Sequence, residues 1–342
     1  MTKHNITIFF SSILLIGCAT IQPDAISLDC SSLQNDLREN DFWKDINARM
    51  IEVETEQPIQ HIEDFSCLDS TMFVLTQDNR LISVNLNTGK KIKEIHRIGH
   101  ARNEMARPLC IDADGQFLYV FDSGKRQFQV LDKDMNFIKN IPAKGVFRNF
   151  IKCKEGFMCS MSVDGTNVLL LDNNGEQKYA KRISSVKGGS MNLMSDAKTF
   201  VKDIAGNIYA KGNYSDSIYI WDGKELILKY DIELGKRYAD KTSTELDKID
   251  NSATLSYCVL RNNLVFSTMM NRVIRWHLYD LKKNNHFVGV PARINGTPFG
   301  PKYQNGKILA DVLMREQIRN EKKEKVDEPN KFVILLYEYV GK

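Results

Sequence analysis

A strand that ends in an aspartate or asparagine turn recurs along most of this 342-residue sequence, and it constrains the fold more than any other feature. The copies are LISVNLNTG (81–89), FQVLDKDMN (128–136), VLLLDNNGE (168–176), IYIWDGKE (218–225), IRWHLYDLKKN (274–284) and FVILLYEYVGK (332–342). The polar residues that end these strands recur at similar intervals: Asn85, Asp132, Asp172, Asp222 and Asp280, with Glu338 in the last copy. Asp and Asn side chains bond to the backbone of tight turns, so each copy reads as a strand followed by a turn.

The most complete copy predicts three consecutive strands at 117–121, 127–131 and 137–141. Asp, Gly and Asn residues separate them and Pro142 ends the last one, which is the pattern of an antiparallel meander. A further short strand precedes most copies, for example around Cys67, Cys110 and Cys258. Four-stranded units with a period of about 40–60 residues are typical of propeller blades, so we expect an all-β chain.

Segment 46–53 (INARMIEV) is strand-like but has no partner nearby in the sequence. The last copy, at 332–342, lacks a fourth strand. An N-terminal strand pairing antiparallel with 332–339 would complete that blade and remove an open edge. We therefore expect residues 45–342 to form a six-bladed β-propeller of four-stranded antiparallel blades, closed by an N-terminal strand pairing with the C-terminal blade.

The N-terminus carries a targeting signal. Lys3 and His4 precede an apolar stretch at 6–16, which is shorter than the roughly 20 residues that a helix needs to span a bilayer. Leu15-Ile16-Gly17-Cys18 resembles the lipobox of bacterial lipoprotein signal peptides. The resemblance implies that residues 1–17 are removed and that Cys18 is lipidated, followed by a flexible tether at 18–44.

The lipobox and the repeats together resemble the bacterial six-bladed propeller lipoproteins, which share their architecture with NHL-like and TolB-like propellers. The resemblance implies a membrane-anchored protein of the bacterial cell envelope. Ala19 and Thr20 after the lipidated cysteine are compatible with sorting to the outer membrane, and the side that the protein faces stays open.

Four of the seven cysteines, Cys67, Cys110, Cys153 and Cys258, fall at comparable positions of successive inner strands. Equivalent positions in separate blades exceed the roughly 7 Å Cα separation that a disulfide allows, so we expect buried thiols. Cys153 and Cys159 flank a hairpin turn and are the pair for which a disulfide stays open. Cys30 sits in the tether and could be free.

Loop 97–108 supplies the candidate ligand-binding residues. Related propellers carry a Gly-rich loop ending in Glu here, and Gly99 and Glu104 fit that pattern. If the loop reaches the channel mouth, His100, Arg102 and Arg107 could contact an anionic or sugar ligand. The alternative, that Glu104 and the arginines only pair with neighbouring blades, stays open.

No catalytic residue, metal ligand or cofactor is assigned, because the sequence has no nucleophile elbow, P-loop or CxxC motif. Asp112, Asp203 and Asn262 could contribute to a channel cation site, or they could simply be turn residues. The formal charge of +4 comes without a concentrated run of basic residues, which argues against binding of nucleic acid.

We expect a monomeric, non-enzymatic binding module for an unknown protein or glycan partner. The alternative is a propeller enzyme, similar to lactonases, hydrolases or lyases, with a metal in its channel.

Overall fold

The computed structural model describes residues 25–31, 36–37, 40–162, 165–184, 198–212, 215–235, 251–270, 273–289, 293–315 and 330–341. Cys18, the loop at 186–194, the short helix predicted near Ser243 and most of 315–328 lie outside the described residues.

Strands make up most of the described chain, together with one short 3-10 helix, η2 (Asp41–Asp45). Four antiparallel sheets of four strands each are formed by β3 (Ile62–Leu68), β4 (Thr71–Thr76), β5 (Leu81–Asn85) and β6 (Lys91–Ile95); by β7 (Pro108–Ala113), β8 (Phe117–Asp122), β9 (Gln127–Asp132) and β10 (Phe137–Pro142); by β11 (Asn149–Cys153), β12 (Gly156–Ser162), β13 (Thr166–Asp172) and β14 (Gln177–Ser184); and by β19 (Asn251–Leu260), β20 (Asn263–Met270), β21 (Val273–Asp280) and β22 (Asn285–Gly289).

A nine-stranded sheet has the order β1-β18-β17-β16-β15-β25-β26-β27-β2. Its strands are β1 (Ile26–Asp29), β2 (Ile46–Glu54), β15 (Phe200–Lys202), β16 (Ile208–Lys211), β17 (Ser217–Trp221), β18 (Leu226–Glu233), β25 (Tyr303–Asn305), β26 (Ile308–Met314) and β27 (Lys331–Tyr339). One parallel bridge, between Lys202 and Asn305, joins its two meanders. A small hairpin of β23 (Arg293–Ile294) and β24 (Thr297–Pro298) completes the described sheets.

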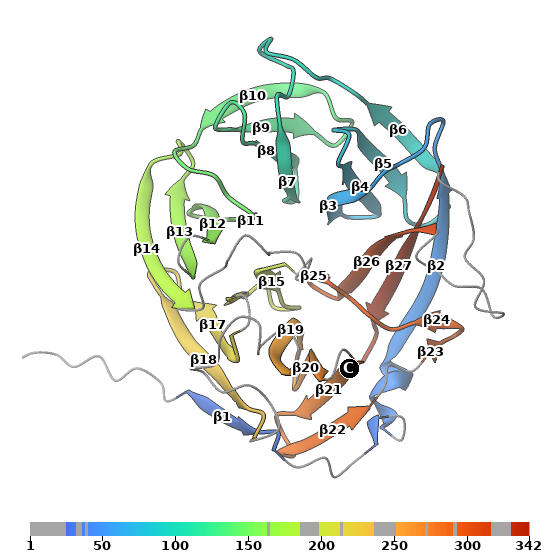
Figure 1. The fold of residues 1–342 in the computed structure, drawn as a ribbon, viewed down its shortest axis with the longest axis vertical. Helices are drawn as coiled ribbons and strands as arrows, with labels where there is room; N and C mark the ends of the chain where they lie inside the picture. The colour runs from blue at the N-terminus through green and yellow to red at the C-terminus, as the bar shows by residue number, and fades with distance from the viewer. Residues whose placement is uncertain are drawn as a thin grey trace, which may run out of the picture.

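The sheets are arranged around a common centre, with the first strand of each meander innermost and the last at the outside (Figure 1). This arrangement is a β-propeller with four-stranded antiparallel blades. The predicted all-β class is therefore confirmed, and the strands predicted at 117–121, 127–131 and 137–141 correspond to β8, β9 and β10.

The repeated polar residues cap the turn between the third and fourth strands. Each of the five accepts two hydrogen bonds of 2.8–3.0 Å from backbone amides two to four residues ahead: Asn85, Asp132, Asp172, Asp222 and Asp280. This short-range bonding explains why Asp and Asn recur at these positions. Glu338 is different, because it lies inside β27 and not at a turn.

Strand β2 pairs antiparallel with β27 along its whole length, from Ile46 opposite Tyr339 to Glu54 opposite Lys331 (Figure 1). The predicted pairing of 46–53 with 332–339 is present. Ile51, opposite Ile334, is buried in an apolar cluster that packs β2, β26 and β27 against β3, β4 and β5. Similar clusters fill the other interfaces between neighbouring meanders, so the core is divided among these interfaces.

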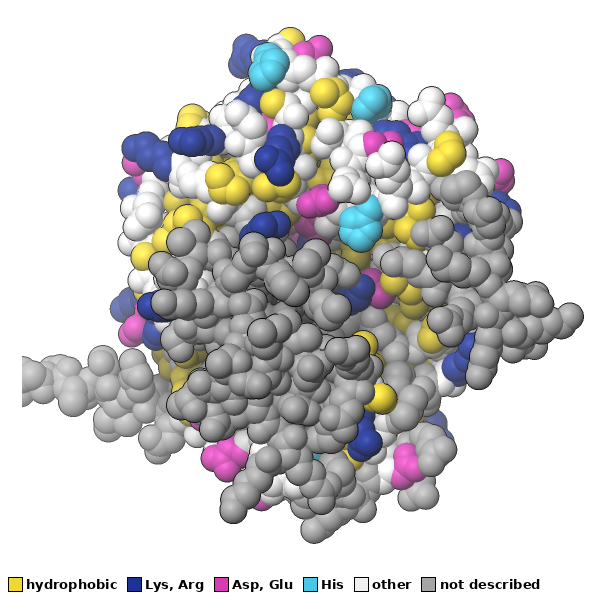
Figure 2. Space-filling view, viewed as in Figure 1, with side chains coloured by type: hydrophobic (Ala, Val, Ile, Leu, Met, Phe, Trp, Pro, Cys, Tyr) yellow, Lys and Arg dark blue, Asp and Glu magenta, His cyan; other side chains and the backbone are white. Residues whose placement is uncertain are grey.

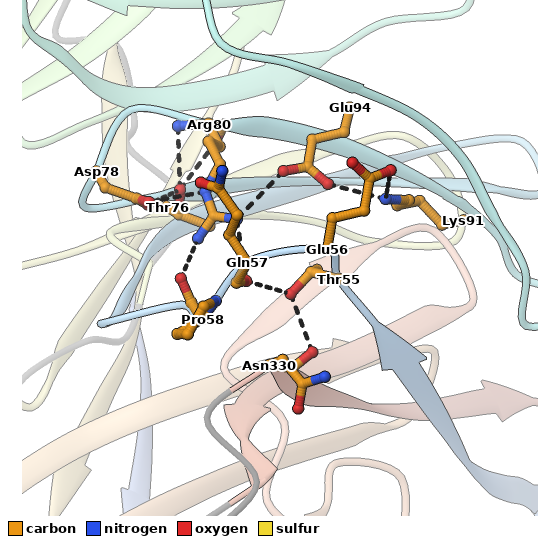
Figure 3. A network of polar contacts seen from close by, with 10 residues as sticks. All are labelled: Thr55, Glu56, Gln57, Pro58, Thr76, Asp78, Arg80, Lys91, Glu94 and Asn330. Atoms are coloured by element: carbon orange, nitrogen blue, oxygen red, sulfur yellow. Dashed lines mark hydrogen bonds and ion pairs between the residues drawn. The ribbon is translucent and has the colours of Figure 1, made fainter.

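The segment that leads from β2 to β3 is held by a polar network around Arg80, a buried residue on the β4–β5 turn (Figure 3). The guanidinium donates to the carbonyls of Gln57 and Pro58 and forms ion pairs with Asp78 and Glu94. Thr55 donates from Oγ1 to the carbonyls of Gln57 and Asn330 at 2.7 and 2.9 Å. The network therefore connects the β2–β3 linker, the first four-stranded sheet and the residue that precedes β27.

The described N-terminal residues form a strap on the outside of the sheets, and the prediction of a flexible tether at 18–44 is wrong for them. Strand β1 pairs in parallel with β18, and Asp36 forms a bridge with Val288 on β22 (Figure 1). Leu28 is fully buried against residues of β18 and β21. Leu28 and Cys30 lie on one side of this segment and are buried, whereas Ile26 is exposed, so burial at 28 and 30 stabilises order here.

All six described cysteines are buried free thiols, as the sequence predicts for Cys67, Cys110, Cys153 and Cys258. Cys153 and Cys159 are not bridged. Cys30 is part of the strap; it is free, as the sequence allows, and its side chain is buried. Among the described residues, no helix is long and apolar enough to cross a membrane.

Candidate ligand-binding site

Hydrogen bonds join the innermost strands at the centre. In each of them a side chain of one meander bonds to the backbone of a neighbouring meander. The pairs in the first half of the chain are Asp64 with the amide of Ile111, at 2.8 Å; Asp112 with the amide of Lys152, at 2.7 Å; and Asn149 with the amide of Thr199, at 2.7 Å. In the second half, Gln304 exchanges two hydrogen bonds with Val259, and Tyr303 accepts from the amide of Cys67. Buried polar side chains are satisfied in this way while they fix neighbouring meanders relative to each other.

Lys198 lies at the centre of this region, two residues before β15 begins, and is almost fully buried. Its ammonium forms an ion pair with the buried carboxylate of Asp64. It also lies 5.8 Å from the ring centroids of Phe65 and Tyr303. A protein-borne cation thus occupies the middle of the molecule, with its charge balanced by an acidic side chain and two aromatic faces.

Asp112 is the second buried carboxylate of the centre. Ser66 donates to its Oδ1 at 3.1 Å and Lys152 donates from its backbone to Oδ2. Burial raises the pKa of Asp112, and the nearby charge of Lys202 opposes that rise. The remaining space here is a void of about 10 Å³ bordered by Asp112, Lys198 and Tyr303, among others. A void of that size holds about one water molecule, so the centre is filled by side chains.

A much larger cavity, of about 520 Å³, opens beside the centre. Its lining comes from the turns that follow the first and third strands of the meanders: Asp114, Lys152, Cys153, Lys154, Glu155, Lys202, Gly206, Asn207, Ile208, Trp221 and Gly223. This volume is in the range of cavities that bind small molecules. Rigid hairpin turns of three neighbouring meanders form its walls, which suits a preformed site.

Lys202 connects the cavity to the centre, because its side chain lines both spaces. It is half-buried at the end of β15. Lys152 is held in the wall by aromatic contacts, with its ammonium 5.3 Å from the ring centroid of Phe157 and bonded to the carbonyl of Cys153. Three lysines and two acidic residues line the cavity, so its lining is net positive.

The loop residues proposed from the sequence lie elsewhere. The connection between β6 and β7 extends to the outer rim before it reaches β7 (Figure 1). His100 is exposed on it, and Arg102 packs on the outermost strand β10, with its guanidinium 5.8 Å from the ring centroid of Phe137. Asn140 of β10 donates to the carbonyl of Arg102 at 2.9 Å.

Arg107 precedes β7 and is exposed nearer the centre, where its charge acts on Glu63 at the start of β3. The structure therefore does not bring Arg107 together with His100 and Arg102. Successive turns of an antiparallel meander alternate between its two ends, so this loop and the 520 Å³ cavity lie on opposite faces. Ligand binding by the three residues stays a prediction.

The face that carries this loop shows basic, acidic and apolar side chains interspersed over its described part (Figure 2). Glu104 closes the loop on itself, because its carboxylate accepts from the amide of Ala101 at 2.9 Å. It also fills the space where a Cβ at Gly99 would stand, 2.0 Å from Glu104 Oε2, and Gly99 has a φ of +150°. Gly99 and Glu104 are thus explained by the loop's own geometry.

No group of three or more His, Cys, Asp or Glu side chains suited to a metal ion occurs among the described residues. Of the three candidates from the sequence, Asp203 and Asn262 are turn residues: Asp203 accepts from the amide of Asn207, and Asn262 is exposed in the β19–β20 turn. Asp112 is not, because it lies within β7 and bonds to the next meander.

Sequence reasoning missed the cavity residues Lys202, Lys154 and Trp221. Lys202 and Trp221 end strands β15 and β17, and Lys154 lies in the β11–β12 turn, so the three form no local motif. The sequence does carry one signal for this site. In two meanders a lysine stands at or next to the end of the innermost strand, Lys152 in β11 and Lys202 in β15.

Comparisons with solved structures support the fold. An exported protein from Bacteroides fragilis NCTC 9343 superposes with a TM-score of 0.64 at 12% identity, covering 93% of this chain and 100% of the other. A member of the DUF4221 family from Bacteroides vulgatus gives a TM-score of 0.50 at 9% identity, covering 86% of this chain and 98% of the other. Identities this low show a shared fold alone.

A search of curated proteins finds no match. The model of the domain of unknown function DUF4934 matches residues 25–334, so this chain belongs to the DUF4934 family.

Proposed function

We propose that this protein is a lipid-anchored binding module of the bacterial cell envelope, and that it binds its ligand in the 520 Å³ cavity. The cavity carries the proposal, because it combines the volume of a small-molecule site with polar side chains on rigid turns. The partner class is a glycan or a glycan-bearing molecule.

The platform in this proposal is a closed ring of six blades. Its support is that, among the described residues, β15–β18 pair with the meander of β25, β26, β27 and β2 at a single position, Lys202 with Asn305, so the nine-stranded sheet counts as two blades beside the four separate sheets. The pairing of β2 with β27, and the apolar cluster between the last and first meanders, support closure. A closed ring removes sheet edges and keeps the cavity walls in place.

The anchor is Cys18, supported by the match of residues 15–18 to a lipobox. Because the strap is paired from Ile26 onward, seven residues separate Cys18 from the folded structure. Seven residues and their flanking bonds span at most about 28 Å. The outer edge formed by β1 and β18 would then stay close to the bilayer, which we propose to be the outer membrane.

The alternative of a metal-dependent propeller enzyme has weaker support. The ammonium of Lys198 is paired with Asp64 where a channel cation would have to bind, and the adjacent void is about 10 Å³. A metal there would have to displace a charge that is covalently part of the chain.

Two experiments test the two parts of the proposal. Membrane fractionation of Cys18→Ala should move the protein from the membrane to the soluble fraction or block its processing, and unchanged membrane association would contradict the anchor. A glycan array probed with the mature protein should give binding that Lys154→Trp, which places a bulky side chain at the cavity, abolishes. Loss with Arg102→Ala but not with Lys154→Trp would instead assign binding to the β6–β7 loop.

A further inference from the structure

The polar groups that line the large cavity divide into those already bonded and those without a partner. Asp114 is fully engaged, because its carboxylate accepts from the amides of Gln116 and Phe117 and from the hydroxyl of Tyr119. The amide nitrogen of Asn207 donates to Asp203 at 2.9 Å. The carboxylate of Asp114 is therefore already occupied, and part of the Asn207 amide is engaged as well.

Two ammonium groups remain at the cavity. Among the described residues, neither Lys202 nor Lys154 forms a hydrogen bond or ion pair through its side chain. Lys202 is half-buried at the inner end, and Lys154 is exposed at the opening. The charge of Lys202 acts on Asp112, but that carboxylate is already bonded to Ser66 and to the amide of Lys152. A partly buried ammonium of this kind favours an anion brought by a ligand.

The indole of Trp221 adds a third donor. Its Nε1 is buried and has no hydrogen-bond partner among the described residues. The ring is fixed by an edge-on contact with Tyr179, with centroids 5.3 Å apart. Buried N–H groups are normally bonded, so an acceptor supplied by a ligand would satisfy this donor in the cavity wall.

We propose that this cavity binds an anionic saccharide unit, one that carries a carboxylate or phosphate group recognised by Lys202 and Lys154. The inference deepens the proposed function and rests on it. Within the described part of the chain, Lys202, Lys154 and the Trp221 indole are donors without a partner, whereas the carboxylate of Glu155 is the acceptor at the exposed opening, so the inner part of the cavity suits a ligand rich in acceptors. Glu155 is exposed at the opening, whereas Lys202 is half-buried, and the three lysines and two acidic residues together leave the lining net positive. A volume of about 520 Å³ accommodates one or two sugar rings.

Calorimetric or NMR titration at low salt tests the proposal with three probes: glucuronate, glucose 6-phosphate and glucose. We expect at least one anionic probe to bind at least about tenfold more tightly than glucose, and its affinity to fall with added salt. The two anionic probes separate carboxylate from phosphate recognition. Lys202→Met and Lys154→Met should each weaken binding of the anionic probe, whereas Lys139→Met on the exposed outer strand β10 should not.

Lys154 is exposed, so we expect Lys154→Met to fold normally. This variant keeps the test valid even if Lys202→Met is unstable. Lys202→Arg, which keeps the charge, should retain binding. Equal affinity for glucose and both anionic probes, or unchanged affinity in both lysine-to-methionine variants, would overturn the inference. Binding of neutral glycans only would leave the proposed function standing, whereas no binding on the glycan array would contradict that function itself.

Discussion

Arg80 donates from Nη1 to the backbone carbonyl of Gln57 at 3.2 Å, and through this bond the first meander holds the linker that arrives from β2. The same guanidinium bonds to Pro58, Asp78 and Glu94 (Figure 3). A planar group with five donors is suited to such a junction, since it can satisfy carbonyls and carboxylates at once.

Arg80→Met should therefore lower the free energy of unfolding by about 3–5 kcal/mol, because two carbonyls and two carboxylates lose their shared donor in a buried place. Arg80→Lys should recover only part of the loss. Arg49→Met, on the exposed face of β2, provides the control and should change stability by less than about 0.5 kcal/mol. Urea denaturation measures all three, and equal midpoints for Arg80→Met and Arg49→Met would contradict the role of the network.

The strap can be tested with a reporter already present in the chain. Leu28 is 0% exposed on β1, Ile26 on the same strand is 43% exposed, and the thiol of Cys30 is 1% exposed. Leu28→Asp should detach the strap and make Cys30 reactive towards a thiol reagent under native conditions, whereas Ile26→Asp should leave it protected. Protection of Cys30 in Leu28→Asp would show that the strap does not depend on burial of Leu28.

The repeated turns were predictable from the sequence because their cause is local. Asp132 bonds to amides only two and four residues ahead, so its identity reports directly on the turn. The strap was missed because Leu28 pairs with Ile232 on β18, far from it along the chain. The short alternation of apolar and polar residues at 26–30 did not indicate which strand this segment would pair with.

The candidate site was less predictable than the fold. The β6–β7 loop was expected at the channel mouth, but Arg102 packs on the outer strand β10, which a single sequence does not indicate. Lys202, Lys154 and Trp221 converge only because turns of adjacent meanders meet in space. Sites assembled in this way leave no spacing pattern to recognise.

Alkaline pH should destabilise the protein through its buried thiols. Burial raises the pKa of Cys67 to about 12 and that of Cys153 to about 11, and it raises the pKa of the other four as well. In the unfolded chain these thiols ionise near pH 8.5, so above about that value the folded state holds more protons and stability falls as pH rises. Each thiol contributes up to about 1.4 kcal/mol per pH unit.

Lys211 opposes this trend, because burial lowers its pKa to about 8 and stability then rises with pH up to about 10.4, the unfolded value. One lysine is outweighed by six thiols. The urea midpoint, measured under reducing conditions between about pH 7.5 and 10, should fall above about pH 9, and less steeply in Cys110→Ala. A midpoint that stays constant or rises over this range would contradict the burial of the thiols.

The pairing of β2 with β27 is the relationship on which the proposed closed ring, and with it the proposed platform for the cavity, depends. Substitutions at two adjacent residues of β2 distinguish loss of the packed strand from an effect of any charge on its surface. Ile51 is 7% exposed and faces the cluster shared with the first meander, while Met50 is 46% exposed. The decisive measurement is the urea-unfolding free energy of Ile51→Asp against that of Met50→Asp. We predict a loss of at least about 3 kcal/mol for Ile51→Asp, from lost burial and an unpaired charge, and less than about 0.5 kcal/mol for Met50→Asp. Equal stability of the two variants would contradict closure of the ring by this strand.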